Sequence, residues 1–266
     1  MRRRAFSLLE LSVVLVIVGL VAGVALSFKQ SAVQDCVETS KTQLETINAA
    51  VKRFAAKNDR LPLPAVRTAG VEDVNFGREA PLGELDVEGA GKVVFGAVPF
   101  QALELAPSYS ADCWGNKLSY AVTIDLTDRT KFLREPPQTP IDGAITLKTS
   151  ANTTVSTTAA YAVVSHGLNA VGAVKNNYRD PTNTDRKWCG AGSTLDSENC
   201  DVGNAVLMAA SFNDGKDAGA STFDDIIIFS GKPLKVLIAR CNNSVPLGCN
   251  PGIVANDGGQ TACGTT

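Results

Sequence analysis

The stretch "RRRAFSLLELSVVLVIVGL", residues 2–20, decides how the chain is organised. Three arginines precede an apolar run from Phe6 to Phe28, and the one charged residue of this run is Glu10. As a helix, the run of 23 residues would be about 34 Å long, which is enough to cross the hydrocarbon layer of a membrane. Because positive charge favours the cytoplasmic side, we expect the N-terminus in the cytoplasm and the rest of the chain beyond the membrane.

A cleaved secretory signal peptide is the competing interpretation of this run. Ala22 and Ala25 would supply the small residues of a signal cleavage site. Glu10 argues against it, because a carboxylate at the centre of a bilayer costs roughly 2.5 to 3.5 kcal/mol, and a discarded segment has no use for one. We therefore predict that the run is retained as a membrane segment and that Glu10 has a function.

The segment after the apolar run is also predicted to be helical. Between residues 29 and 58, apolar side chains recur at helical spacing, while Lys and Glu residues occupy the other faces. The first proline of the chain is Pro62. We therefore expect one continuous helix from residue 6 to residue 58, called the stem helix, which is hydrophobic on all sides in 6–28 and amphipathic in 29–58.

Residues 59–266, called the head, are predicted to be mostly β-structured. We expect loop over most of 59–91 and an exposed turn in the Ser- and Thr-rich strip 149–158, and one interpretation of 98–105 is a short helix. The expected fold class is α+β, with the long N-terminal helix packed on an antiparallel β-sheet. Short β-branched runs predict strands at 92–98, 117–124, 143–149, 160–165, 204–210, 224–229 and 234–239.

The N-terminal residues resemble a known family. "RRRA" followed by "FSLLELSVVLVIVGLVAG" is similar to the leader and stem of type IV pilins and type II secretion pseudopilins. The resemblance implies that a prepilin peptidase removes residues 1–5 by cutting between Ala5 and Phe6, and then methylates the new amino group of Phe6. Glycine is usual where this chain has Ala5. The resemblance also implies a partner for Glu10, namely the ammonium group of Phe6 in a neighbouring filament subunit.

Three segments of the head extend this resemblance. "DCWGNKLSY", residues 112–120, and "YAVVSHGLNAVGA", residues 161–173, are similar to strand and turn segments of major pseudopilins. "FDDIII", residues 223–228, is similar to the acidic start of their last strand. The resemblance therefore implies a pilin-like head.

Seven cysteines are many for a cytosolic protein of this length, and they indicate an oxidising compartment. Because the number is odd, at least one thiol is free or pairs with another chain. Cys36 on the stem helix and Cys113 in a predicted loop form a candidate pair that would tie the head to the stem. The other disulfide candidates are Cys189 with Cys200, and one bridge among Cys241, Cys249 and Cys263.

The loop "FNDGKDAGASTFDDI", residues 212–226, is the candidate metal site. Its carboxylates are hard oxygen ligands of the kind that calcium prefers, and major pseudopilins carry a calcium near their last strand. A solvated acidic turn is the simpler alternative. No other cofactor is expected. The candidate ligands are Asp214, Asp217, Asp224 and Asp225.

Catalysis is not expected. His166 is the only histidine, and the adjacent Ser165 would point to the opposite face of a strand. The chain contains no HExxH, GxSxG or P-loop motif. The net charge of -2 and the pI of about 5.5 also disfavour nucleic acid as a partner.

The favoured function is therefore a structural subunit of a type II secretion pseudopilus. The alternative is a minor type IV pilin in pilus assembly, adhesion or DNA uptake, and a membrane-anchored enzyme is the least favoured. The implied partners are other pilin-like subunits through the stem helix, the prepilin peptidase and an inner-membrane assembly platform. The implied location is the bacterial inner membrane with a periplasmic head, and then a filament in the periplasm or at the cell surface.

Overall fold

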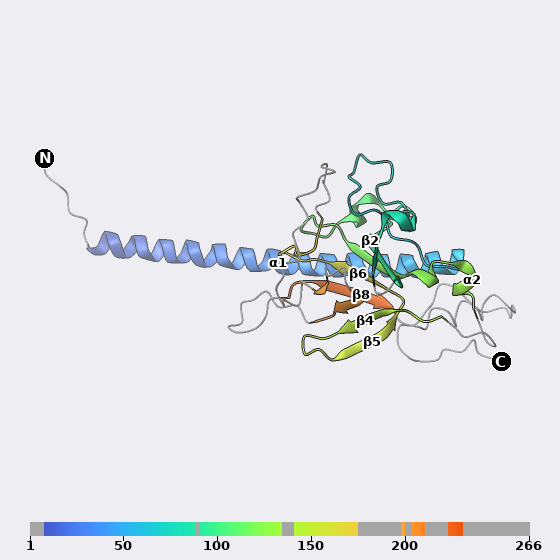
Figure 1. Ribbon diagram of the computed structural model, residues 1–266. Coiled ribbons are helices and arrows are strands. Elements are labelled where there is room, and N and C mark those ends of the chain that lie inside the picture. The colour runs from blue at the N-terminus through green and yellow to red at the C-terminus, as the bar shows by residue number, and fades with distance from the viewer. Residues whose placement is uncertain are drawn as a thin grey trace, which may run out of the picture.

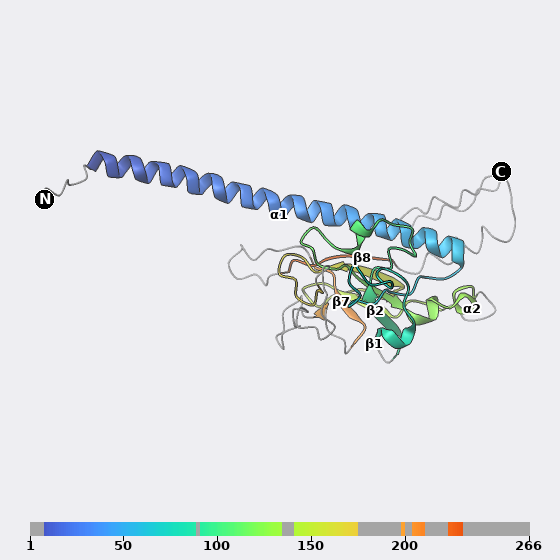
Figure 2. The ribbon, with the colours of Figure 1, turned by 90° about the horizontal axis from the view of Figure 1, so that it is seen from above.

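A computed structural model describes residues 8–88, 91–134, 141–174, 198–199, 204–210 and 223–230, with the side chains of 8–10, 22–31 and 88 outside the description. Its largest element is helix α1 (Leu8–Asn58), which extends well past one end of the head and then runs along one side of it (Figures 1 and 2). Within the described residues, the predicted stem helix is confirmed as one continuous helix.

The C-terminal end of α1 lies where the sequence predicts it. The backbone N–H of Asp59 still donates to the carbonyl of Ala55, and Asp59 then adopts a left-handed conformation with φ of 54°. The side-chain amide of Asn58 donates to the carbonyl of Phe54. Asn and Asp tolerate the left-handed region better than most residues, so these two residues stop the helix just before Pro62.

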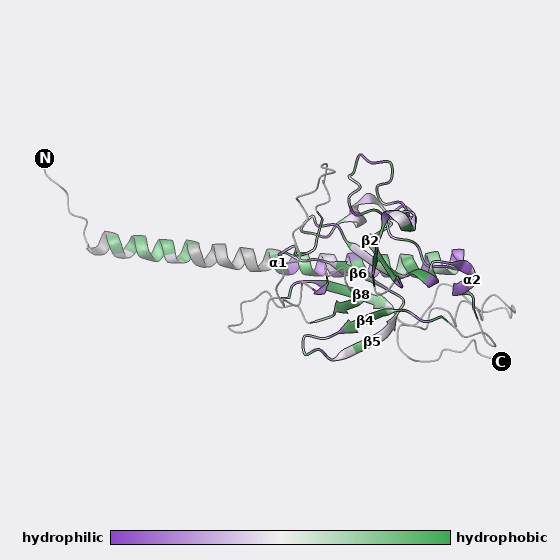
Figure 3. Ribbon diagram, in the orientation of Figure 1, coloured by the Kyte–Doolittle hydropathy of each residue, from purple (hydrophilic) through white to green (hydrophobic). Residues whose placement is uncertain are grey.

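Within the described part of the chain, no helix is sufficiently long and apolar to cross a membrane. The predicted span at 6–28 falls partly on residues and side chains outside the description. Figure 3 shows the described apolar residues of α1 near its N-terminal end, far from the head.

The head contains two sheets. The larger one has five strands in the order β1-β2-β3-β6-β8, and every neighbouring pair is antiparallel. The smaller one has the order β5-β4-β7, with β4 and β5 antiparallel. The strands are β1 (Asp86–Glu88), β2 (Val93–Ala97), β3 (Ser119–Thr123), β4 (Ile145–Lys148), β5 (Thr154–Ala159), β6 (Tyr161–Ser165), β7 (Val206–Met208) and β8 (Ile226–Ser230).

The second sheet departs from the single antiparallel sheet that the sequence predicts. Strand β7 pairs with β4 in parallel, which is possible because the two strands are far enough apart in the sequence for a crossover connection. Strand β5 lies in the Ser- and Thr-rich strip that was expected to be a turn, and most of its side chains are not buried. The predicted strand at 234–239 lies outside the described residues.

Only short helical turns accompany the sheets. The segment 98–105 forms turns instead of the short helix that was one interpretation, and Glu104 has a left-handed φ of 58° that a continuing helix would not accept. The short helices are η1 (Leu82–Glu84), η2 (Pro107–Ser110), η3 (Ile124–Leu126) and α2 (Arg129–Phe132).

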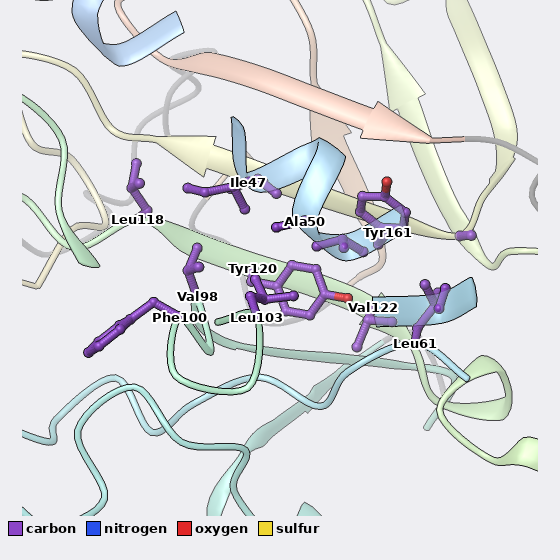
Figure 4. Packing of buried hydrophobic residues seen from close by; sticks show 14 of the residues in the cluster. Ile47, Ala50, Leu61, Val98, Phe100, Leu103, Leu118, Tyr120, Val122 and Tyr161 are labelled. Atoms are coloured by element: carbon purple, nitrogen blue, oxygen red, sulfur yellow. The ribbon is translucent and has the colours of Figure 1, made fainter. Parts of the chain in front are cut away.

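The five-stranded sheet is covered on both faces. On β3, Tyr120 and Val122 pack in the cluster that includes Ile47 of α1, whereas Ala121 packs in a second cluster with residues of the smaller sheet. Figure 4 shows Ile47 and Tyr120 in the first cluster, together with Tyr161 of β6. Because both faces are covered, every residue of β2, β3 and β6 is buried, and most of these residues are apolar rather than alternating with polar ones.

Candidate functional site: the stem helix and its junction with the head

The N-terminal part of α1 presents apolar side chains on every side. Nine large apolar residues between Leu11 and Val21 are each 50% to 66% exposed. Six of them are consecutive, from Val13 to Val18, so they project in all directions around the helix. A helix that is hydrophobic all round is stable only against lipid or other apolar helices, so this segment requires an apolar partner.

The predicted processing and assembly residues precede this segment in the sequence. Ala5 and Phe6 are outside the described residues. Glu10 lies in α1, but its side chain is outside the description. The structure therefore places Glu10 on the helix that carries the exposed apolar surface.

The stem helix is joined to the head by a disulfide between Cys36 and Cys113, with the two Cα atoms 5.4 Å apart. This confirms the candidate pair that would tie the head to the stem. Cys36 is the first buried residue among the described side chains of α1. Among the described side chains, the covalent link therefore lies at the start of the buried part of the helix.

Cys113 is held by a turn that Asp112 organises. The Asp112 carboxylate accepts hydrogen bonds from the backbone N–H groups of Trp114 and Asn116, at 3.0 and 2.9 Å, and from the Ser165 hydroxyl at 2.8 Å. Gly115 supplies the positive φ of 76° that the turn requires. Burial raises the pKa of Asp112, while these donors act in the opposite direction.

Asn116 connects this turn to the next strand. Its side-chain amide donates to the carbonyl of Gly167, just after β6, at 2.7 Å. The turn is therefore bonded to the central sheet on one side and to the stem helix on the other.

Lys117 follows the turn and was not singled out from the sequence. It is only 3% exposed, and its ammonium group donates to the carbonyls of Arg67 (2.6 Å) and Ala69. It also lies 5.5 Å from the centre of the Phe76 ring. Burial lowers the pKa of Lys117 to about 8. A lysine opening the apolar run "KLSYAVTI" was the available sequence signal.

Polar contacts also join α1 to the head. The Tyr161 hydroxyl of β6 donates to the side-chain oxygen of Asn48 at 2.6 Å, and both residues are buried. Nearer the disulfide, the Ser40 hydroxyl accepts the backbone N–H of Cys113 at 3.5 Å. Helix and head are therefore matched by specific hydrogen bonds as well as by apolar packing.

Two of the four candidate calcium ligands, Asp224 and Asp225, lie in the described residues. Asp224 accepts the backbone N–H of Asn169 at 2.7 Å, and Asp225 accepts the side-chain amide of Asn199 at 2.7 Å. Both carboxylates are buried, and each binds a neighbouring loop. Asp214 and Asp217 lie outside the described residues. In the described ranges, no group of three or more His, Cys, Asp or Glu residues is placed to hold a metal ion.

His166 is hydrogen-bonded to Ser119 and not to the adjacent Ser165. Its Nε2 lies 2.7 Å from the hydroxyl oxygen of Ser119 and is hydrogen-bonded to it, whereas Ser165 donates to Asp112. His166 is 1% exposed, so this pair is closed off from solvent and joins β3 to the end of β6.

The cysteine candidates 189, 200, 241, 249 and 263 lie outside the described residues.

Comparison with known proteins identifies the N-terminal segment. Residues 1–26 match the family model for the prokaryotic N-terminal methylation motif. No curated protein and no solved structure gave a match. The match covers the proposed cleavage position, Glu10 and most of the exposed apolar surface of α1. The chain thus carries, at its N-terminus, the methylation motif that is the hallmark of type IV pilin-like, prepilin-type proteins.

Proposed function

We propose that this chain is a structural subunit of a type II secretion pseudopilus. The observation that carries the proposal is that the methylation motif at residues 1–26 continues into one helix with an apolar surface on all sides and a head fixed to its other half. A chain built in this way can first lie in a membrane and then exchange lipid for the stems of neighbouring subunits.

Processing would create the charge that Glu10 pairs with. Water cleaves the peptide bond between Ala5 and Phe6, which leaves a carboxylate on Ala5 and an ammonium group on Phe6. A methyl group from a methyl donor then replaces one hydrogen of that ammonium group. In the filament, this cation lies against Glu10 of a neighbour, so two charges that are costly in an apolar medium become one pair.

The basic N-terminus and the disulfide also support a location, with the N-terminus in the cytoplasm and the head in the periplasm. The basic residues Arg2, Arg3 and Arg4 stay in the cytoplasm, and the head lies in the periplasm before assembly. The disulfide between Cys36 and Cys113 supports this location, because such bonds persist in oxidising compartments. Filament assembly would then draw the stem out of the inner membrane.

Mass spectrometry of the protein extracted from membranes tests the processing step. We expect an N-terminus at Phe6 that carries one additional methyl group. Ala5→Gly should be processed normally, whereas the larger side chain of Ala5→Leu should block cleavage. An intact Met1, or an N-terminus beyond Ala22, would contradict the proposal.

A deletion strain separates the two filament types. A pseudopilus subunit should be required for exoprotein secretion, while pilus-dependent motility and DNA uptake remain normal. Normal secretion with impaired motility or DNA uptake would instead assign the chain to the minor pilins. Complementation with the unaltered gene is the control for both readouts.

A further inference from the structure

Figure 2 shows that the C-terminal part of α1 lies along the head. The sequence of this part has opposite charges at its two ends. Residues 32–46 contain three carboxylates and one lysine, and we call this segment the acidic end; residues 47–58 contain only Lys52, Arg53 and Lys57 as charged residues, and we call this segment the basic end. Asp35 in the first and Arg53 in the second are both exposed. The outward surface of the helix is therefore strongly polarised along its axis.

The interior contacts of the molecule do not account for this pattern. Among the described residues, Asp35, Glu45 and Arg53 form no ion pair, although the charge of Arg53 helps to lower the pKa of Glu104. Lys57 pairs with Glu104 at 2.7 Å, but both side chains are 69% exposed, and such surface pairs contribute little stability. The helix dipole does not explain the acidic end either, because its effect is confined to the first and last turns of a helix and Asp35 lies far from both.

The spacing of these charges defines how two copies would fit. Asp35 and Arg53 are 18 residues apart, which is five helical turns, so they project from the same side of α1 about 27 Å apart along the axis. Two parallel copies side by side without a shift would oppose acid to acid and base to base. A shift of about 27 Å would instead place Arg53 of one copy beside Asp35 of the other.

We propose that the basic end of α1 in one subunit binds the acidic end of α1 in a second, parallel copy displaced by about 27 Å along the filament. This copy is a different neighbour from the one whose Phe6 ammonium group pairs with Glu10, and the contact sets the axial register between these two subunits. The inference rests on the proposed function, which supplies the parallel copies. The apolar residues 11–21 span only about 15 Å of helix, so they do not overlap between two copies displaced by about 27 Å and cannot define this register. The charges define the register because opposite charges attract when the copies are shifted by about 27 Å, whereas like charges repel when the copies are not shifted.

Chemical cross-linking of assembled filaments tests the contact. Filaments are made from equal amounts of unlabelled and nitrogen-15-labelled full-length subunits, and a carbodiimide joins carboxylates directly to amines. We expect peptides that link Lys57 of one isotope to Asp35, Glu38 or Glu45 of the other. The Lys57–Glu104 pair within one copy is the internal control, because it should cross-link in every sample.

The outcomes separate this inference from the proposed function. Filaments that assemble without mixed-isotope links between the two ends would overturn the register contact and leave the function intact. Equal yields of these links from detergent-solubilised subunits would also overturn it, because they would indicate antiparallel pairs or random encounters. Failure of processing at Phe6 would instead remove the proposed function.

Charge exchange provides a second test. Arg53→Glu and Asp35→Lys should each lower filament yield at least several-fold, while co-expression of the two variants should restore a large part of it. Arg53→Lys is the matched control and should assemble normally. Unchanged thermal unfolding of each variant excludes misfolding, and unimpaired assembly of both single variants would overturn the inference.

Discussion

Several buried polar residues of this protein bond segments that are distant in the sequence. The Lys117 ammonium group binds two carbonyls of the 67–69 loop, and the Tyr161 hydroxyl binds Asn48 of the stem helix. A buried donor or acceptor that loses its partner costs about 1 to 3 kcal/mol. Such residues therefore favour one arrangement of loop, sheet and helix over its alternatives.

Lys117 should make stability depend on pH in alkaline solution. Burial lowers its pKa from 10.5 in the unfolded chain to about 8 in the folded one, so between these values the unfolded state binds more protons. The free energy of unfolding should therefore rise from pH 8 to pH 10.5, by at most about 3 kcal/mol. Denaturant titrations at three pH values would measure this rise.

The variant Lys117→Met is the control for that experiment. It keeps a long apolar side chain but has no ionisable group, so its stability should vary less with pH than that of the unaltered protein. If the two proteins showed the same pH dependence, Lys117 would not be the group responsible.

Glu10 should matter for assembly and not for membrane insertion. In the proposed filament, Glu10→Ala removes the partner of the Phe6 ammonium group, and it leaves the apolar run 6–28 without a charged residue. We expect a subunit that is inserted, cleaved and methylated, but that forms filaments at least tenfold less often. Glu10→Asp keeps the charge and should retain part of the assembly, as electron microscopy would show. Abundant filaments of Glu10→Ala would remove this role.

At the scale of elements, the disulfide between Cys36 and Cys113 determines how the stem helix meets the head. It links residues with a sequence separation of 77, which in the chain-entropy model stabilises the fold by roughly 4 kcal/mol. Its location gives it a second effect. Because Cys36 is the first buried residue among the described side chains of α1, the bond fixes this end of the helix–head contact to the Cys113 turn.

Removing this bond should loosen the helix before the sheet. In the double variant Cys36→Ser with Cys113→Ser, we expect backbone amides of residues 36–47 to exchange hydrogen at least tenfold faster, while amides of β3 and β6 change much less. Hydrogen exchange followed by mass spectrometry measures both regions in one sample. Equal acceleration in the helix and the strands would show that the disulfide acts only on global stability.

The acidic loop 212–226 is a second element with a testable property. Calcium binding there stays a prediction, and it implies a higher unfolding temperature in calcium than in a chelator, because a ligand that binds only the folded state stabilises it. Asp214→Asn and Asp217→Asn are the informative variants, since Asp224 and Asp225 also hold Asn169 and Asn199. The same unfolding temperature of the unaltered protein in calcium and in chelator would contradict the prediction.

The whole molecule is built in layers, with the five-stranded sheet between α1 and the smaller sheet. Among the described side chains of α1, burial begins at Cys36, and the described apolar residues from 11 to 21 contribute nothing to either core cluster. The head with residues 32–58 of the helix therefore forms a unit that does not depend on the apolar segment. The apolar segment is available for contacts with other molecules.

This separation predicts that a chain beginning at residue 32 folds alone. We expect a monomer with native circular dichroism and an intact bond between Cys36 and Cys113, but no filaments. Light scattering combined with thermal unfolding measures its size and stability. A truncated protein that is unfolded or aggregated would show that the first 31 residues are needed for the head.

Part of this architecture could be predicted because its determinants are local. The continuous helix follows from apolar periodicity and from the absence of proline before Pro62. The strands β2, β3, β4, β6, β7 and β8 follow from short β-branched runs. Strand β5 was missed because its side chains are mostly polar and exposed, and β1 because three residues give too short a pattern.

The sequence by itself determined the N-terminal motif, the helix that carries it and the class of the head, since cleavage signals, helical spacing and strand composition are properties of neighbouring residues. Only the tertiary structure decided which distant groups meet, such as Lys117 with the 67–69 loop and His166 with Ser119. It also confirmed the bond between Cys36 and Cys113, which the sequence offered only as a candidate pair. The physical reason is that these contacts depend on strand register and on how loops close, which no short stretch of sequence specifies.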